Sequence, residues 1–264
     1  MTHQADVNNN EWHQQWSMHQ DDEKFLFHDW IKPVTISEFK GKKVLEAGCG
    51  GGQHSKWMAE QAASLTSVDL NTVDLALERN QGTDNINFIK ADIATMELGE
   101  QFDIVICIGV IHHTDDPDKT FHNLYKHLKP NGKMIIWTYS SEGNALVRYG
   151  VEPFRKLFLR HLPISILNMV SKFITTMVYI PVHTIYRLGF FSFLPYYDYF
   201  KNFRKLSFNR NNLNVFDKLN APQTRFTTRQ KCDEWFSPDL FNKESISILP
   251  YAGVSYSLVG IKRS

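Results

Sequence analysis

Short apolar segments and helical segments alternate between residues 43 and 139, and this alternation limits the fold more than any other feature of the chain. The predicted strands are residues 43–47, 65–68, 86–89, 102–108 and 133–139. The fourth of them is largely apolar without alternation, as expected of a strand buried on both faces. Strands that alternate with helices form a parallel, doubly wound sheet, and ligands bind beyond the carboxyl ends of its strands.

A glycine-rich turn follows the first predicted strand. The segment VLEAGCGGGQHS, residues 44–55, leads through Gly48, Gly50 and Gly52 into a predicted helix. A strand, a turn of this kind and a helix are typical of nucleotide binding, where the usual ligand is an anionic pyrophosphate. The carboxylate of Glu46 would repel a pyrophosphate, so the turn fits a ligand with a cationic group better. This argues against an NAD-dependent dehydrogenase.

Carboxylates also follow the second and third predicted strands. Asp69 is placed to accept hydrogen bonds from the hydroxyls of a ribose. Asp92 is placed to accept one from an adenine amino group, with Ile93 packing on the ring. S-adenosylmethionine contains an adenine and a ribose, has no phosphate, and carries an ammonium and a sulfonium. It is therefore the ligand that these side chains, together with Glu46, predict.

The segment Glu46-Ala-Gly48-Cys-Gly50-Gly-Gly52 resembles the E/D-x-G-x-G-x-G signature of class I S-adenosylmethionine-dependent methyltransferases. The resemblance continues, in the family's order, through residues 68–70, 91–93, 109–113 and 128–132. If the glycines only formed a tight turn and the acids only capped helices, this joint pattern would be unexplained. The resemblance implies S-adenosyl-L-methionine as cofactor and S-adenosyl-L-homocysteine as product. It places the cofactor against Glu46, Gly48, Gly50, Gly52, Asp69, Leu70, Asp92, Ile93, Ile108 and Gly109. No His or Cys cluster has metal-ligand spacing, so no metal is expected.

Two histidines follow the fourth predicted strand, where they would face the methyl donor. A hydroxyl acceptor must lose a proton, and the ordinary histidine pKa suits a general base at neutral pH. In several relatives acting on small molecules, a histidine matching His113 has this role. We therefore expect His113 as the base, with His112 as an alternative base or a substrate contact. The competing interpretation is that both histidines only pack or cap within the loop.

The alternation of strands and helices stops after Tyr139. The expected division is an N-terminal segment over the cofactor site (1–40), a cofactor-binding core (41–140), a helical, basic and aromatic lid insertion (141–213) and a completion of the sheet (214–264). The final part contains an expected antiparallel hairpin. The resulting fold class is α/β, a Rossmann-like, doubly wound, seven-stranded and mostly parallel sheet.

The insertion is both apolar and basic. Residues 148–229 contain thirteen Lys and Arg but three Asp and Glu, a balance of +10 in a chain whose net charge is +1. Its longest charge-free run is about 14 residues, and a membrane-spanning helix needs roughly 20, so no span is expected. The apolar residues could form a lid core, dock on a partner, rest on a membrane surface or line an acceptor pocket. We expect Tyr196, Tyr197 and Tyr199 to be substrate contacts.

These features predict a cytoplasmic methyltransferase that acts on a small or amphipathic, anionic or lipid-like acceptor, most simply at oxygen. Peripheral contact with an anionic surface would use the basic insertion. A tRNA- or RNA-modifying methyltransferase is the first alternative, because the segment GVIHH recurs in such enzymes, although no appended RNA-binding module is visible. The second alternative is a non-catalytic protein that binds the S-adenosyl ligand.

Overall fold

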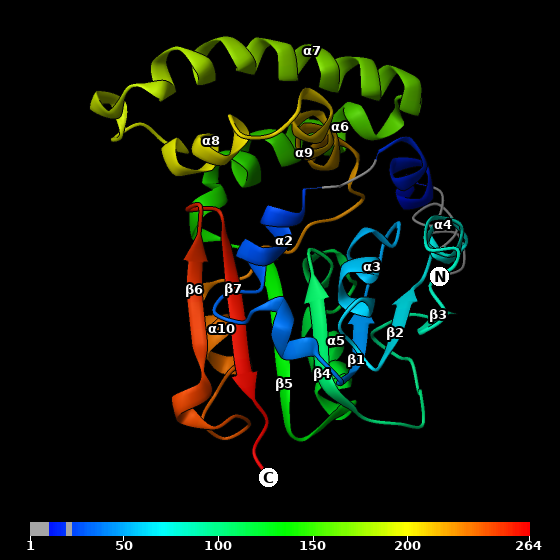
Figure 1. Cartoon of the computed structure of the whole chain (residues 1–264). Helices are drawn as coiled ribbons and strands as arrows, with labels where there is room; N and C mark the ends of the chain where they lie inside the picture. The colour runs from blue at the N-terminus through cyan, green and yellow to red at the C-terminus, as the bar shows by residue number, and fades with distance from the viewer. Residues whose placement is uncertain (1–10, 20–22) are drawn as a thin grey trace.

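The computed structural model describes residues 11–19 and 23–264, and its centre is one seven-stranded sheet (Figure 1). The spatial order of the strands is β3-β2-β1-β4-β5-β7-β6. The five strands from β3 to β5 are parallel, and β7 runs antiparallel to both β5 and β6. The predicted fold class is confirmed. The strands are β1 (Lys43–Ala47), β2 (Ser64–Asp69), β3 (Ile86–Lys90), β4 (Phe102–Ile108), β5 (Leu128–Tyr139), β6 (Ser247–Tyr251) and β7 (Ser255–Ile261).

The position of β1 decides where a ligand can bind. This strand pairs with β2 on one side and with β4 on the other, so the chain reverses its direction of winding here. The carboxyl ends of neighbouring strands on the two sides of such a switch point leave a crevice between the loops that follow them. The glycine turn after β1 and the histidine loop after β4 both lie at this crevice.

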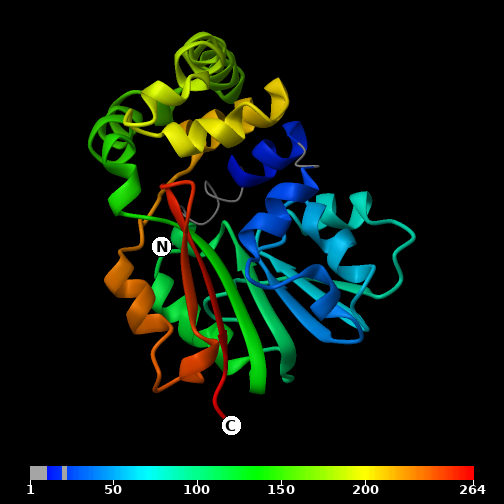
Figure 2. The same cartoon turned by 60° about the vertical axis from the view of Figure 1, so that its left-hand side comes forward.

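Helices cover both faces of the sheet, as Figures 1 and 2 show. Two of them begin with a side-chain cap, because Asp116 accepts a hydrogen bond from the backbone N–H of Lys119 and Thr228 accepts one from that of Lys231. Such caps satisfy N–H groups that the first helical turn leaves unpaired. The helices that lie against the sheet are α2 (Lys24–Trp30), α3 (Gln53–Ala59), α4 (Val73–Arg79), α5 (Pro117–Lys126) and α10 (Arg229–Trp235).

A layer of helices lies across the carboxyl edge of the sheet, where the insertion was expected (Figures 1 and 2). We call it the lid. It comprises α6 (Glu152–Leu157), α7 (Ile164–His183), α8 (Tyr197–Phe203) and α9 (Phe208–Asn220). Helix α9 crosses the boundary expected between residues 213 and 214, because its apolar face continues through Phe216 and Leu219, which are buried against α7.

Helix α7 is longer than the charge-free run that we counted. It accommodates both Lys172 and Pro181 and reaches 20 residues. Among the described residues, α7 is long and apolar enough to cross a membrane. Length and composition alone are weak evidence for a span. Only 17% of its most apolar stretch is buried, so it is not an ordinary core helix either.

One local feature of the sheet differs from expectation. The fifth strand was expected to begin at residue 133, but β5 already begins at Leu128. The pairing with β4 is irregular here, since Phe102 pairs with Leu128 and Ile104 pairs with Lys133. Asn131 has a φ of 59°, a left-handed conformation that asparagine tolerates better than most residues. The turn therefore forms a bulge within the strand.

Candidate functional site

The carboxyl ends of the parallel strands open into a cavity of about 270 Å³. Residues 11–18 and helix α9 also contribute to its wall, so the cavity lies between the sheet and the lid. Most of the side chains expected at a donor site meet here. The expected residues that line the cavity are Gly48, Gly50, Asp69, Leu70, Asp92, Ile93, Ile108, Gly109 and His113.

The glycine turn brings the backbone close to neighbouring elements. Gly48 has a φ of +81°, and a Cβ there would lie 2.5 Å from the side chain of Val110. Gly52 has a φ of +73°, and a Cβ there would lie 2.9 Å from Ala76 of α4. Gly48 lines the cavity, whereas Gly52 does not. The third glycine of the motif thus allows helix packing and does not form part of the cavity wall.

Asp69 shapes the loops at the end of β2. Its carboxylate accepts hydrogen bonds from the backbone N–H groups of Gly50 at 3.0 Å, Asn71 at 2.8 Å and Thr72 at 3.2 Å. Burial raises the pKa of this carboxyl, while the N–H groups act in the opposite direction. Asp69 therefore holds the glycine turn and the β2 loop together at the cavity wall.

Asp92 and Ile93 follow β3, and both line the cavity. The carboxylate of Asp92 accepts a hydrogen bond from the backbone N–H of Ala94 at 2.8 Å and from the hydroxyl of Thr95 at 3.3 Å. Asp92 is exposed, so one face of its carboxylate is accessible, while Ile93 is buried beside it. An apolar surface next to an accessible carboxylate suits a flat ring that carries an amino group.

Glu46 lies below the glycine turn and does not line the cavity. Its carboxylate accepts hydrogen bonds from the hydroxyls of Ser55 at 2.5 Å and Ser67 at 2.7 Å. Burial raises the pKa of Glu46 to about 7, against the effect of the two hydroxyls and with a contribution from the nearby Asp69. Any effect of Glu46 on a ligand therefore acts through its charge and not through a contact with the cavity.

Two amide oxygens at the cavity have no hydrogen-bond partner among the described residues. They are Oε1 of Gln53, at the start of α3, and Oδ1 of Asn71, after Asp69. A buried acceptor that is left unpaired costs free energy, so a ligand that donates hydrogen bonds would be stabilised here. Neither residue was predicted from the sequence, although Asn71 lies two residues after the end of β2 and Gln53 is the first residue of the helix after the glycine turn.

His113 lines the cavity, and its tautomer follows from its neighbours. Its Nδ1 lies 2.8 Å from the backbone carbonyl oxygen of Gln223. A carbonyl oxygen can only accept, so Nδ1 carries the proton and Nε2 is the proton-accepting nitrogen. Burial lowers the pKa of His113, and the charge of Asp217 acts in the opposite direction. The ring is therefore neutral at pH 7, as a general base must be.

His112 occupies a different environment. Its side chain is fully buried and does not line the cavity. Its Nδ1 lies 3.2 Å from the hydroxyl of Thr138, and its ring centre lies 4.3 Å from that of Tyr139. Burial lowers the pKa of His112 well below the ordinary value. The structure thus separates the two histidines, placing His113 at the cavity and His112 in the packing behind it.

Helix α9 and residues 11–18 complete the cavity with a chain of polar contacts that the sequence analysis missed. The carboxylate of Asp217 accepts hydrogen bonds from Nε2 of Gln15 at 3.2 Å and from the hydroxyl of Tyr139 at 3.1 Å. Trp12 lies beside His113, with ring centres 4.8 Å apart. No periodic signal marked these residues, because segments far apart in the sequence bring them together.

A second, smaller cavity of about 80 Å³ adjoins the first. Trp30, Trp137, Tyr139, Arg210 and Asn214 line both cavities, so the two are compartments of one site.

The second compartment is aromatic and basic. Of the three tyrosines expected to contact substrate, Tyr196 and Tyr199 line it and Tyr197 does not. Lys218 also lines it, with its Nζ 5.5 Å from the ring centre of Tyr199 and 5.6 Å from that of Tyr139. A cation above aromatic faces is stabilised by the ring quadrupoles and can also attract an anionic ligand group.

The cysteines do not belong to the chemistry of the site. Cys49, Cys107 and Cys232 are buried, and burial raises the pKa of each thiol, to about 12 for the latter two. Such thiols are poor nucleophiles at neutral pH. Within residues 11–19 and 23–264, no group of three His, Cys, Asp or Glu side chains is arranged to hold a metal ion.

Comparison with known proteins is consistent with this geometry. Residues 45–136 match the family model described as a methyltransferase domain. The chain is 32% identical over 146 residues to the ubiquinone biosynthesis O-methyltransferase of Pseudomonas entomophila strain L48, a match that covers 50% of this chain and 62% of that relative. The mitochondrial protein of the same name from Schizosaccharomyces pombe is 32% identical over 108 residues, 39% of each chain. The matches thus span less than two thirds of these relatives.

Two solved structures share the fold over nearly the whole chain. Magnesium protoporphyrin IX methyltransferase from Synechocystis PCC 6803, with bound S-adenosylhomocysteine, has a TM-score of 0.53 at 14% identity and covers 97% of this chain and 94% of its own. The N-methyltransferase NodS from Bradyrhizobium japonicum WM9, in complex with S-adenosyl-L-homocysteine, has a TM-score of 0.50 at 13% identity, covering 96% and 100%. At these identities the likeness shows the fold alone.

Proposed function

Because this chain belongs, through residues 45–136, to the class I S-adenosylmethionine-dependent methyltransferases, we propose that it transfers a methyl group from S-adenosyl-L-methionine to an oxygen of a small anionic acceptor. The name of its O-methyltransferase relatives supports oxygen as the acceptor atom. The two compartments of the site divide the work, with the donor at the strand ends and the acceptor under the lid.

One observation supports the donor assignment most strongly. The wall at the strand ends offers acceptor oxygens, namely the unpaired amide oxygens of Gln53 and Asn71 and the carboxylates of Asp69 and Asp92. Among the described residues, no lysine lines this compartment, and its one arginine, Arg210, belongs to helix α9 and not to the loops at the strand ends, so those loops offer a phosphate neither lysine nor arginine. A ligand with an ammonium, ribose hydroxyls and an adenine amino group can donate hydrogen bonds to these acceptors. The positive φ of the turn glycines allows the backbone of the turn to approach such a ligand closely. S-adenosylmethionine fits this set, while a dinucleotide does not.

The residues of the chain then have separate tasks. Gln53 and Asn71 would hold the amino-acid end of the cofactor and its neighbouring hydroxyls, Asp69 the ribose, and Asp92 with Ile93 the adenine. When bound, S-adenosylmethionine supplies a methyl group on a positively charged sulfur, which an oxygen nucleophile can attack. Positioning supplies much of the rate of such an in-line transfer.

His113 would act on the acceptor. Its Nδ1–H is held by the carbonyl of Gln223, so Nε2 is available to remove the proton from an acceptor hydroxyl. The imidazole then becomes a cation, and the nearby charge of Asp217 stabilises it. This arrangement favours an acceptor whose hydroxyl must be deprotonated as the oxygen attacks.

The second compartment supports an acceptor that is aromatic or amphipathic and carries a negative charge. Tyr199 and Trp137 provide aromatic surfaces, and Lys218 provides a cation. The indole N–H groups of Trp30 and Trp137 are buried without a hydrogen-bond partner among the described residues, so an acceptor oxygen at this point would satisfy one of them.

Calorimetric titration of the purified protein tests the donor assignment. S-adenosylhomocysteine should bind, NAD should not, and Asp92→Ala should weaken the binding of S-adenosylhomocysteine. Glu97→Ala is the matched control, because Glu97 is exposed, lies on the same loop and pairs with Lys126 outside the cavity. Tight binding of NAD, or no binding of S-adenosylhomocysteine, would contradict the proposal.

A further inference from the structure

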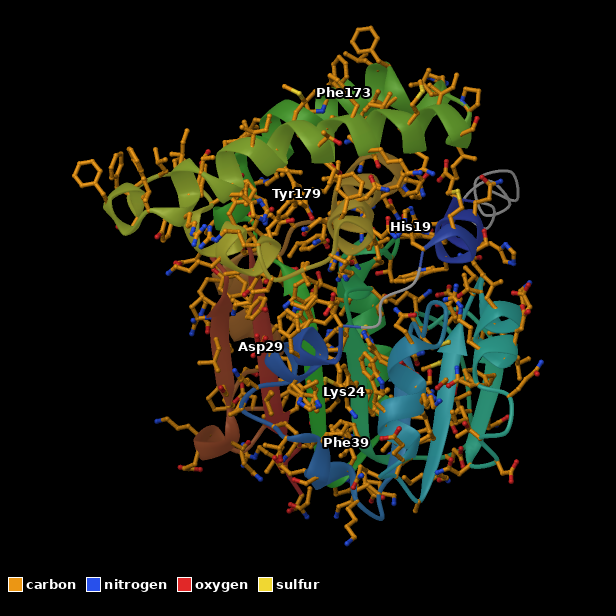
Figure 3. The ribbon with its side chains drawn as sticks, turned by 45° about the horizontal axis from the view of Figure 1, so that its top comes forward. His19, Lys24, Asp29, Phe39, Phe173 and Tyr179 are labelled. Atoms are coloured by element: carbon orange, nitrogen blue, oxygen red, sulfur yellow. The ribbon has the colours of Figure 1, made fainter. Side chains whose placement is uncertain are left out.

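The outer face of α7 is an exposed apolar stripe. Five side chains at helical spacing of three or four residues form it: Ile166, Met169, Phe173, Met177 and Ile180, exposed by 40%, 65%, 66%, 53% and 64%. In Figure 3, Phe173 lies at the outer edge of the lid, away from the sheet. A single exposed apolar residue needs no explanation, but a continuous stripe marks an interaction surface.

The stripe continues beyond α7. Leu188, Phe190 and Phe193 follow that helix and are exposed by 54%, 82% and 72%. In α6 and directly after it, Phe154, Leu157 and Phe158 are exposed by 54% to 69%. We use the name outer lid face for these exposed residues and the stripe of α7 taken together. They come from several elements of the helical layer at the top of Figure 1.

The inner face of α7 combines an apolar contact, in which Leu167 packs with Phe216 of α9, with a buried polar contact. Ser171 and Thr175 are fully buried there, and the hydroxyl of Ser171 donates a hydrogen bond to Oδ1 of Asn212 in α9 at 2.5 Å. The hydroxyl of Thr175 donates to the backbone carbonyl of Ser171 at 2.7 Å and lies 3.4 Å from the same oxygen of Asn212. A helix that holds polar groups against its own protein and exposes a stripe of apolar side chains is arranged for contact with an apolar environment.

Basic side chains border the outer lid face. Lys156, Lys172, Arg187 and Lys205 are exposed, and residues 148–229 carry a balance of +10. The acidic residues of this stretch do not cancel the charge at the outer surface. Glu152 is buried and paired with Arg155, and Asp217 lies at the cavity. Asp198 is exposed and pairs with Lys201.

We propose that the outer lid face docks on an anionic lipid bilayer, with α7 lying in the plane of the interface. Apolar side chains would enter the boundary between headgroups and acyl chains, and the surrounding cations would contact anionic headgroups. Charge complementarity selects this occupant over a second copy of the chain, because two lids, each with a balance of +7 over residues 152–220, repel each other when they meet face to face. The acidic remainder of the molecule is repelled by the same bilayer, which fixes the orientation.

This docking would connect the bilayer with the site. Helix α9 contacts α7 through Asn212 and Phe216, and its other residues Asn214, Asp217 and Lys218 line the two compartments. Helix α9 therefore connects α7, which carries the exposed stripe, with the acceptor compartment. The docking proposal does not depend on methyl transfer, and the titration of S-adenosylhomocysteine remains an independent test of the proposed function.

Flotation with lipid vesicles tests the proposal. The full chain should float with vesicles that contain phosphatidylglycerol and remain behind with vesicles of phosphatidylcholine alone. The double variant Phe173→Ser, Met177→Ser and the double variant Lys172→Glu, Arg187→Glu should each lower binding to the anionic vesicles by about tenfold or more. Both variants change exposed side chains, so thermal unfolding and S-adenosylhomocysteine binding should stay as in the wild type.

Matched controls lie on other faces of the molecule. Leu77→Ser replaces a leucine that is 51% exposed on α4, and Lys40→Glu with Lys42→Glu reverses two exposed lysines near the start of β1. Neither control should alter flotation. Equal binding of the lid and control variants would overturn the proposal, as would failure of the wild type to bind anionic vesicles. Sedimentation velocity that shows a dimer lost in Phe173→Ser, Met177→Ser would assign the face to a second copy instead. Resistance of the vesicle-bound protein to alkaline carbonate extraction would replace surface docking by a membrane span.

Discussion

Nδ1 of His113 lies 2.8 Å from the backbone carbonyl oxygen of Gln223, and Nε2 of Gln223 returns a hydrogen bond to the carbonyl of His113 at 3.1 Å. This reciprocal pair joins the loop after β4 to the segment after α9. The lid is thereby attached to the imidazole that faces the cavity. The same contact fixes the tautomer, so the chemistry of His113 depends on the position of a segment 110 residues away.

The first prediction concerns the base. His113→Ala should lower kcat about 10²-fold or more, because the acceptor hydroxyl then lacks a proton acceptor. Binding of S-adenosylhomocysteine should change little. The exposed His122 of α5 offers a matched control, and His122→Ala should leave kcat unchanged. If His113→Ala turns over at the wild-type rate, positioning alone accounts for catalysis.

The second prediction concerns pH. His113 works as a base only when neutral, so kcat/KM should fall as the pH drops through its pKa, which burial has lowered below 6.5. Asp217 raises this pKa. Asp217→Asn removes that effect, and the acidic limb of the pH profile should therefore move to lower pH. Asp198→Asn, on the exposed part of the lid, is the control. If the acidic limb moves to higher pH or stays in place, the charge of Asp217 does not raise the pKa of the catalytic base.

The third prediction concerns the ribose site. Asp69→Asn should weaken S-adenosylhomocysteine binding by about 1–3 kcal/mol, since one charged acceptor for the ligand hydroxyls is lost. The amide keeps the size of the side chain and an oxygen for the glycine turn. Isothermal titration measures the effect, and Asp84→Asn, in an exposed loop, should bind as the wild type does. Unchanged affinity in Asp69→Asn would remove this residue from the site.

The fourth prediction concerns Glu46 and stability. Its pKa is about 7 in the folded protein and near 4.5 in the unfolded chain, so the folded state holds a proton that the unfolded state has lost between these values. The stability gained from this proton is complete below pH 4.5 and disappears as the pH rises through 7. Glu46→Gln carries no such dependence and should exceed the wild type in free energy of unfolding by about 1–3 kcal/mol at pH 8.

Urea unfolding at several pH values measures the difference for Glu46→Gln. Glu78→Gln, at an exposed position of α4, should show no pH-dependent gain. A constant difference between pH 5 and pH 8 would mean that Glu46 is ionised throughout, contrary to the effect of its burial.

Local sequence patterns were sufficient to predict the strands of the sheet and most of the residues at the strand ends that line the cavity. The parallel strands β1 to β4 are short, and each ends at or within two residues of a glycine or an acid, and the ends of parallel strands must meet at one edge. That reasoning placed Gly48, Asp69 and Asp92 correctly at the cavity. It could not tell which way a side chain at a strand end points, and Glu46 turns to Ser55 and Ser67 below the turn.

Site residues that are brought together only by tertiary packing could not be predicted from the sequence. Gln15 and Asp217 meet only because residues 11–18 and α9 fold over the same edge of the sheet. The apolar run within α7 was visible in the sequence, but a sequence does not show which side of a helix faces solvent. Ser171 is buried against Asn212, and the apolar stripe that includes Phe173 is exposed, which only the structure shows.

Transfer of labelled methyl groups tests the central claim most directly. S-adenosylmethionine labelled in its methyl group would be incubated with the protein and a source-cell extract, which is then separated into lipid, small-metabolite and RNA fractions. The account predicts label in the lipid or small-metabolite fraction with the wild type and about 10²-fold slower labelling with His113→Ala. Label in the RNA fraction would show that the acceptor is an RNA and not a lipid or a small metabolite. If no fraction is labelled while S-adenosylhomocysteine still binds, the proposed methyl transfer is contradicted, and the protein only binds the ligand.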